Sequence, residues 1–444
     1  MKKVTIYIAM FAVLASATAF ILVKNKKKED GFSPLKERTG ISAKSEEYAL
    51  TKKKADALFE SIKQNPLDIK PKLELASLYI QEARITGDHV YYDAAAMKLA
   101  NAVLKTDSNN FEANVFKGTI YLSQHHFADA LKIAEHVQRI NPYNAFVYGM
   151  LIDANVELGN YEAAVTNSDK MVSIRPDMRS YSRISYLREI YGDNEGAIEA
   201  MKMAVSAGYP GDEGTEWARV HLGQLYENTG DVMNAQMQYS LALQERTDYA
   251  YAYAGMGRVS RAAKNYADAI HYYLKADSLV VDYTFKDELT GLYLMNGEKE
   301  KAAANAKVVI EMLAKDAKSG IKDENIGHYA DRELAYAYLK TNETDKALEH
   351  ANLEYNRRPD NIDVNETLAW VYYNKNDFAN AAKYIAVALK TNSKNPTLLS
   401  RAALIYAKAG NMGKAHELAK AALQKNANLH DDLKVELAKV IPTV

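Results

Sequence analysis

Residues 216–249 read EWARVHLGQLYENTGDVMNAQMQYSLALQERTDY and contain the pattern that decides the fold. In the first half, small and apolar residues recur with helical periodicity, at Leu222, Gly223, Leu225 and Tyr226. Gly230 then interrupts the segment, because glycine readily ends a helix in a left-handed conformation. In the second half, Ala235 and Ala242 are seven residues apart and share one helix face. The stretch therefore predicts two helices joined by a short loop.

The same pattern recurs along most of the chain. Nine alanines share one local setting, namely Ala130, Ala164, Ala197, Ala235, Ala269, Ala302, Ala347, Ala381 and Ala415. Their successive spacings are 34, 33, 38, 34, 33, 45, 34 and 34 residues. Prolines that stop the chain follow several of the second helices, at Pro142, Pro176, Pro210 and Pro359. A period near 34 residues indicates stacked helical units that share one continuous core.

This pattern resembles the tetratricopeptide repeat family, whose 34-residue units carry small residues at the eighth, twentieth and twenty-seventh positions. The resemblance covers nine repeats from Phe111 to Leu429 and a degenerate repeat from about Lys72 to Thr106. It implies an all-α fold, a right-handed superhelical solenoid of about ten helix-turn-helix repeats with a C-terminal capping helix. Three departures stand out. Glu354 occupies a position expected to be small, residues 208–215 add a few residues, and residues 313–327 add about eleven. The added residues are expected to form loops.

Composition restricts the function. Of the 444 residues, 48% are hydrophobic and 25% charged, which predicts a folded chain with a sizeable core. With 56 basic and 57 acidic side chains, the formal charge of −1 disfavours nucleic acid as a partner. The absence of cysteine excludes disulfides and thiolate metal sites.

The chain divides into five predicted segments. These are 1–23, an N-terminal transmembrane signal-anchor or signal peptide; 24–44, a charged linker; 45–107, a leading helix with the degenerate first repeat; 108–429, nine tetratricopeptide repeats; and 430–444, a capping helix and tail.

The N-terminal segment has three interpretations. The apolar run from Val4 to Val23 is twenty residues long, enough to span roughly 30 Å as a helix, which matches a bilayer core. The small residues around Ala19 offer a cleavage site, and a buried core helix is the third interpretation. Lysines close behind Ala19 hinder export of a cleaved chain, so they favour the anchor. Lysines on both sides of the run leave its orientation undecided.

We therefore expect a bacterial membrane-anchored or exported member of the family. The expected localisation is single-pass through residues 4–23 with the repeat body periplasmic. The alternative is a secreted or periplasmic protein after cleavage near Ala19.

The resemblance also implies where a partner binds. In the family, the first helix of every repeat lines a concave groove that binds peptides. The expected groove residues combine aromatic rings with arginines, which are typical of binding hot spots: Arg179, Arg183, Tyr186, Trp217, His221, Gln224, Asn228, Tyr251, Arg258 and Arg261. The alternative is that they are ordinary solvated or capping side chains of a long groove. A second candidate cluster is Tyr336, Trp370 and Tyr373, although Trp370 equally fits a packing role.

No motif for catalysis or metal binding accompanies the repeats. His125 and His126 fall in a loop between two helices, and no histidine pair has the i, i+4 spacing of a metalloprotease helix. The glycines occur singly at loops instead of clustering before a helix as phosphate-binding loops do. The sequence therefore predicts no enzyme, no cofactor and no metal site, with an enzyme that lacks a recognisable motif as the alternative class.

The predicted function is a non-enzymatic protein-protein interaction scaffold or adaptor of the cell envelope that binds partner peptides in the concave groove. The alternative is a chaperone-like assembly or folding factor that binds many client chains. The expected partners are other proteins or peptides, and the membrane through the N-terminal helix. No nucleic acid and no small-molecule substrate is expected, and self-association stays open.

Overall fold

The computed structural model describes residues 31–40, 42–322, 327–424 and 429–440. It forms two compact units, Met1–Glu37 and Arg38–Val444. Residues 31–37, the described part of the first unit, form neither helix nor strand.

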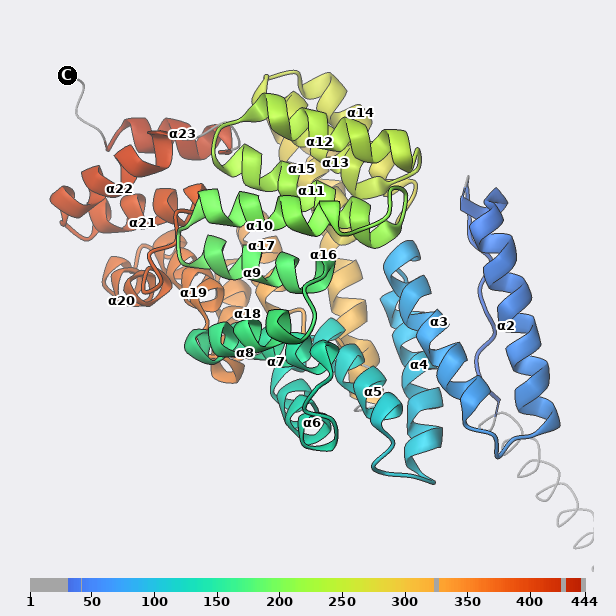
Figure 1. The fold of residues 1–444 in the computed structure, drawn as a ribbon. Helices are drawn as coiled ribbons and strands as arrows, with labels where there is room; N and C mark the ends of the chain where they lie inside the picture. The colour runs from blue at the N-terminus through green and yellow to red at the C-terminus, as the bar shows by residue number, and fades with distance from the viewer. Residues whose placement is uncertain (1–30, 41, 323–326, 425–428, 441–444) are drawn as a thin grey trace, which may run out of the picture. The chain divides into compact units, whose positions relative to one another are not determined.

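The second unit is all-helical over its described residues, which confirms the predicted fold class (Figure 1). A short 3-10 helix η1 (Ser42–Lys44) and a leading helix α2 (Glu46–Gln64) come first. Ten helix pairs follow: α3 (Lys70–Thr86) with α4 (His89–Leu104), α5 (Phe111–Ser123) with α6 (Phe127–Ile140), α7 (Ala145–Leu158) with α8 (Tyr161–Ile174), α9 (Met178–Ile190) with α10 (Asn194–Ser206), α11 (Glu213–Asn228) with α12 (Val232–Glu245), α13 (Ala250–Ala262) with α14 (Tyr266–Asp277), α15 (Tyr283–Met295) with α16 (Lys299–Lys322), α17 (Asp331–Lys340) with α18 (Thr344–Arg357), α19 (Ile362–Asn374) with α20 (Phe378–Ala388), and α21 (Pro396–Lys408) with α22 (Met412–Gln424). The last helix is α23 (Asp431–Ala438).

Local sequence signals fix where these helices begin and end. At many helix starts, an Asn or Asp side chain accepts a hydrogen bond from a backbone N–H group, as Asn110 does for α5 and Asp231 for α12. The loop between the two helices of a pair places one residue in the left-handed region, for example Gly159 at φ +84°. All nine repeat alanines are buried, so each second helix can approach its neighbours closely.

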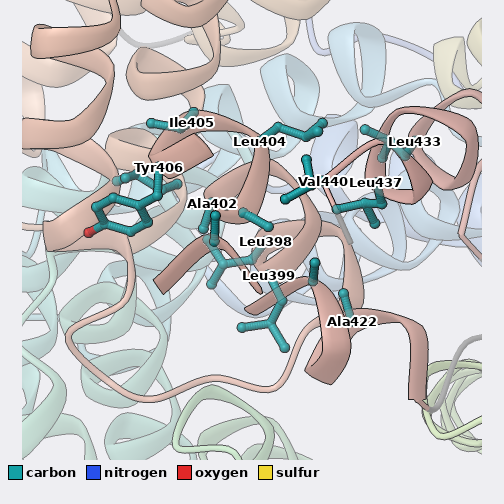
Figure 2. Packing of buried hydrophobic residues seen from close by; sticks show 14 of the residues in the cluster. Leu398, Leu399, Ala402, Leu404, Ile405, Tyr406, Ala422, Leu433, Leu437 and Val440 are labelled. Atoms are coloured by element: carbon teal, nitrogen blue, oxygen red, sulfur yellow. The ribbon is translucent and has the colours of Figure 1, made fainter. Parts of the chain in front are cut away.

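The C-terminal end of the solenoid is covered by α23. Leu437 is 0% exposed, and it joins Leu433 and Val440 in one apolar cluster with Leu398 and Leu404 of α21 (Figure 2). A terminal repeat has no neighbour to bury its apolar face, and α23 takes that place.

The second unit also contacts itself across superhelical turns. Several hydrogen bonds join residues that are between 199 and 205 positions apart in the sequence. At a period near 34 residues this separation corresponds to about six repeats, so one superhelical turn lies against the next. We call α5 to α10 the first turn. We call α17 to α20, with the residues just before α17 and just after α20, the second turn. A contact between the first and the second turn is called an inter-turn contact.

The expected localisation is corrected by the structure. No helix of the described residues is long and apolar enough to span a bilayer, so the single-pass assignment has no support in it. The predicted span, residues 4–23, and the alternative cleavage site near Ala19 lie outside the described residues.

Candidate functional site

The first helices of the repeats form the inner face of the solenoid. First helices of neighbouring pairs contact one another, for example α7 with α9, α11 with α13 and α17 with α19. No comparable contact joins the second helices of neighbouring pairs in the described residues. Elements converge on the inside of a curve, so the first helices line the concave side. We call this side the inner face.

The structure places all ten predicted groove residues on three consecutive first helices. Arg179, Arg183 and Tyr186 lie on α9; Trp217, His221, Gln224 and Asn228 lie on α11; Tyr251, Arg258 and Arg261 lie on α13. They differ in whether their polar groups already have partners within the chain, and that difference separates two kinds of residue.

Arg183 is held by the preceding repeat. Its Nε and Nη2 donate to Oδ1 and Oδ2 of Asp153 at 2.8 and 2.6 Å, a two-point pairing. Burial alone would lower the pKa of Arg183, but the Asp153 carboxylate outweighs it and the pKa is raised. The guanidinium therefore stays charged and braces α9 against α7.

Arg258 is paired in the same way. Its Nε donates to Oε2 of Glu227 at 3.0 Å, and its Nη2 donates to the Tyr239 hydroxyl at 3.0 Å. The Glu227 side chain is only 2% exposed, so this carboxylate depends on Arg258 and Tyr239 for compensation.

Arg261 and Asn228 also have partners inside the chain. Arg261 donates from Nη1 to Oε2 of Glu288 at 2.7 Å, and Asn228 donates to Glu189 at 3.1 Å. Burial would raise the pKa of Glu288, yet Arg261 lowers it below its ordinary value. Most of the predicted polar groove residues thus connect neighbouring repeats.

Arg179 and Tyr186 have side chains that are accessible to a ligand on the inner face. The guanidinium of Arg179 lies 5.4 Å from the Phe146 ring and belongs to an exposed side chain. Burial and the nearby Arg183 lower the pKa of Arg179, against a raising effect of Asp177. Tyr186 is 42% exposed.

Trp217 and His221 form an aromatic platform on α11. Their ring centroids are 4.1 Å apart, and Trp217 is 36% exposed. Burial, followed by the charge of Arg258, lowers the pKa of His221 to about 4, so its ring is neutral at pH 7. A neutral ring beside a tryptophan offers an apolar surface, and Gln224 lies one helical turn further along.

Tyr251 lies apart from this platform. Its ring centroid is 5.6 Å from that of Phe285 and 5.7 Å from that of Tyr249, so it is part of an aromatic group at the start of α13. Burial and then Asp282 raise the pKa of its hydroxyl.

The second candidate cluster has an internal arginine that the sequence did not reveal. Arg401 donates from Nη1 to the Tyr336 hydroxyl at 2.8 Å and to Glu366 at 3.0 Å, and it lies 5.1 Å from the Trp370 ring. Trp370 in turn stacks on Tyr373 at 4.8 Å. The cluster is filled by the chain's own guanidinium.

Sequence reasoning missed the residues that make the inter-turn contacts. Arg358 pairs with Glu157, and Asn361 donates to the carbonyl of Glu157 at 3.1 Å. The N–H of Ile362 donates to the Tyr161 hydroxyl at 2.9 Å. No short-range signal marks these pairs, because they depend on how many repeats complete one superhelical turn.

The added residues after Leu313 belong partly to this inter-turn contact. These residues were expected to form a loop, but the helix α16 extends through Lys322, so the first part of the insertion is helical. The described end of the insertion, Gly327, accepts a hydrogen bond from His126. Glu354, which stands where a small residue was expected, is 2% exposed and receives both Arg357 and Arg358. The buried charge at this position is tolerated because two guanidinium groups neutralise it.

No group of three or more histidine, aspartate or glutamate side chains in the described residues has a geometry that could hold a metal ion.

Part of the chain is similar in sequence to a known repeat family. Residues 366–429, which run from α19 through α22, match the sequence profile described as tetratricopeptide repeat. This segment is similar to tetratricopeptide repeats. The other helix pairs have the same order of a first helix, a loop with one left-handed residue and a second helix. No curated protein matches the chain.

Several solved structures are similar to the chain. The crystal structure of the APC/C hetero-tetramer Cut9-Hcn1 matches with 13% identity and a TM-score of 0.37, over 80% of this chain and 60% of that one. The crystal structure of MamA matches with 18% identity and a TM-score of 0.29, over 36% and 92%. TTC0263, a thermophilic TPR protein in Thermus thermophilus, matches with 20% identity and a TM-score of 0.36, over 40% and 92%. The chain thus spans 60% of the length of the Cut9-Hcn1 chain.

Proposed function

We propose that the chain is a binding protein without catalysis, an adaptor whose inner face holds a segment of a partner protein. The observation that carries this proposal is the contrast on the inner face. Arg183, Arg258 and Arg261 are paired with carboxylates of the chain, whereas Trp217 and Arg179 leave an aromatic surface and a guanidinium open to an outside ligand.

The chemistry of these two groups defines the partner segment. An apolar side chain would stack on Trp217 and the neutral His221, and a carboxylate would bind Arg179. An anion bound at Arg179 would be stabilised further, because Arg183 and Arg175 add positive charge beside this guanidinium. We infer that the partner carries an acidic residue close to a large apolar one.

The inner face also argues against a general chaperone. Large exposed methionines, which suit promiscuous binding, lie on second helices: Met203 on α10, Met233 and Met237 on α12. They are therefore away from the inner face, where aromatic and charged groups favour selective recognition.

The test places a photo-crosslinking amino acid at position 217 in the native cell. The control chain carries it at Tyr143, which is 77% exposed and precedes α7. The proposal expects a small set of proteins captured from position 217 but not from 143. Arg179→Glu should remove this set, because it reverses the charge that the partner's carboxylate needs. Equal capture from both positions contradicts the inner-face site, and a large unspecific set favours the chaperone alternative.

Substitutions of Arg183 or Arg258 are unsuitable for this test. Each would remove the guanidinium that neutralises a carboxylate of the chain, Asp153 or Glu227, so loss of binding would not be separable from loss of folding.

A further inference from the structure

Three histidines from two superhelical turns meet in one cluster. His125 and His126 lie in the loop between α5 and α6, and His328 lies just before α17. The ring centroids of His125 and His328 are 4.3 Å apart, and the ring of His126 stacks on Tyr329 at 3.9 Å. The cluster therefore spans the inter-turn contact.

Hydrogen bonds to backbone groups fix the rings across this contact. His126 Nε2 is 2.5 Å from the carbonyl oxygen of Gly327, and His125 Nδ1 is 3.0 Å from that of Tyr329. The N–H of Tyr329 donates to the carbonyl of Gln124 at 3.1 Å. His126 is only 8% exposed. These partners are more than 200 positions away in sequence, so the bonds exist only while the two turns touch.

The loop itself presents His125 to the second turn. Its backbone has φ +62°, in the left-handed region, at the place where Gly159 stands in the next repeat. Three other loops of the same kind also place a residue with a side chain there, namely Lys264, Asn342 and Asn376. At position 125 the side chain supplies the ring that meets Tyr329 and His328.

Charged groups of both signs surround the rings. His125 faces Arg358, Arg332 and Glu354 of the second turn. His126 faces Asp129 and Arg357. The third ring, His328, faces His125, Glu333, His89 and Asp93. A proton on His125 or His126 would add positive charge beside Arg358, Arg332 and Arg357, with Glu354 and Asp129 as the opposing charges. A proton on His328 would add positive charge beside His125 and His89, with Glu333 and Asp93 as the opposing charges.

We propose that His125, His126 and His328 form an acid-released clasp, which holds the two superhelical turns together while the rings are neutral and lets them separate when the rings are protonated. The proposal rests on this geometry and not on the proposed partner binding. Because Asp363 and Arg358 of the second turn lie near Tyr186 and Glu157 of the first, opening the clasp would also change the inner face.

The direction of the pH effect follows from the histidine pKa values in the closed arrangement. Burial, and next the charge of Arg358, lowers the pKa of His125 to about 4. Burial, and next the charge of His125, lowers the pKa of His328 to about 4. Burial also lowers the pKa of His126. Because the pKa is lower in the closed than in the open arrangement, the histidines stabilise closure fully when the pH is above 6.5, their ordinary pKa. This stabilisation is lost as the pH falls from 6.5 toward 4. At pH 5, protonation of His125 lowers the ratio of closed to open molecules about 30-fold relative to its value at high pH, and protonation of His328 has the same effect.

One neighbouring group acts in the opposite direction. Burial raises the pKa of Glu157, despite its pairing with Arg358, so protonation of this carboxyl favours the closed arrangement. A variant without the three histidines keeps this response and therefore isolates their effect.

The test measures the distance between the two turns by electron paramagnetic resonance. The chain has no cysteine, so spin labels can be placed at Lys132→Cys on α6 and Glu349→Cys on α18 without removing native cysteines. The control pair is Lys132→Cys with Lys170→Cys on α8, both in the first turn. Circular dichroism at each pH reports whether the helices persist.

The clasp predicts that the Lys132–Glu349 distance lengthens reversibly between pH 7.5 and pH 5, with the control distance and the helix content unchanged. In the variant His125→Asn, His126→Gln, His328→Gln, the amides replace the hydrogen-bonding ring nitrogens, and the distance should not lengthen as the pH falls. A constant distance in the native sequence, an equal response in the variant, or loss of helix content with the opening would each overturn the proposal.

A single substitution keeps the test decisive if the triple variant does not fold. His328→Gln removes a titrating ring whose contact with the cluster is its approach to His125. It should shift the midpoint of opening to lower pH. An unchanged midpoint would contradict the clasp.

Discussion

Gly159→Ala tests whether the two superhelical turns touch. Gly159 ends α7 at φ +84° and faces the backbone of the second turn. A Cβ atom at this position would lie 2.8 Å from the amide nitrogen of Asn361 and closer still to the carbonyl of Asp360. Ordinary contacts of a Cβ atom begin at 3.4 Å, so the second turn must move away or the loop must deform.

The magnitude has two parts. An alanine in the left-handed region costs about 1 kcal/mol, wherever it stands in the solenoid. Moving the second turn also strains or breaks the hydrogen bonds from Asn361 to Glu157 and from Ile362 to Tyr161, at about 1 kcal/mol each, and overpacking adds about 1 kcal/mol more. The inter-turn part is therefore about 3 kcal/mol.

Gly410→Ala is the matched control. Gly410 has φ +86°, and an added Cβ there meets no atom within 4 Å, so this variant suffers the backbone penalty alone. Hydrogen exchange of residues 358–364, followed by mass spectrometry, reports the inter-turn contact directly. The extra 3 kcal/mol should speed exchange of the Ile362 amide about 100-fold in Gly159→Ala and leave it unchanged in Gly410→Ala. Equal exchange in both variants would refute the inter-turn contact at Gly159.

Two further predictions concern the packing between repeats. Gly223→Ala should destabilise the chain by about 2 kcal/mol, because its Cβ would lie 2.4 Å from the nearest atom of the Tyr239 ring. Gly291→Ala, whose Cβ would meet no atom within 4 Å, should stabilise the chain by about 0.5 kcal/mol through helix propensity, and urea unfolding measures both changes. Arg258→Ala should lower stability by about 3 kcal/mol, because it removes the guanidinium that neutralises the buried Glu227 carboxylate, and adding Glu227→Gln should recover part of the loss. Failure of the second substitution to recover stability would show that the pairing is not the cause.

The repeat architecture was predictable because its signals are local. Alanines such as Ala235 and Ala242 lie on one face of one helix, and both are 0% exposed in the structure. Loop residues such as Gly230 adopt the left-handed conformation that glycine favours. Each repeat carries these signals in about 34 residues, so no long-range information is needed. The division of the chain into five segments stays a prediction.

The assignment of the inner face was less complete. Sequence reasoning selected Arg183 and Arg258 as groups for a partner, whereas the structure pairs them with Asp153 and Glu227. The separations of 30 and 31 residues are close to one repeat, so a carboxylate one repeat upstream of an arginine was the signal that could have revealed the pairing. Which of the ten groove residues bind a partner stays a prediction.

The inter-turn contacts were out of reach of the sequence. His125 and His126 have the local pattern of ordinary polar loop residues, because their partners lie more than 200 positions away. Whether two turns touch depends on the small rotation between neighbouring repeats, summed over about six of them. A few degrees per repeat, which no motif encodes, separate a closed coil from an open one.

The central claim is that residues about 200 positions apart are neighbours, and crosslinking tests it most directly. Glu162→Cys and Asp360→Cys introduce two exposed thiols beside Gly159 and its contact into a chain that has no other cysteine. A short bis-maleimide reagent should join them within one molecule, with a yield that does not depend on protein concentration and that disappears in urea. If no crosslink forms, or if it forms only between molecules, the two turns do not touch and the account is wrong.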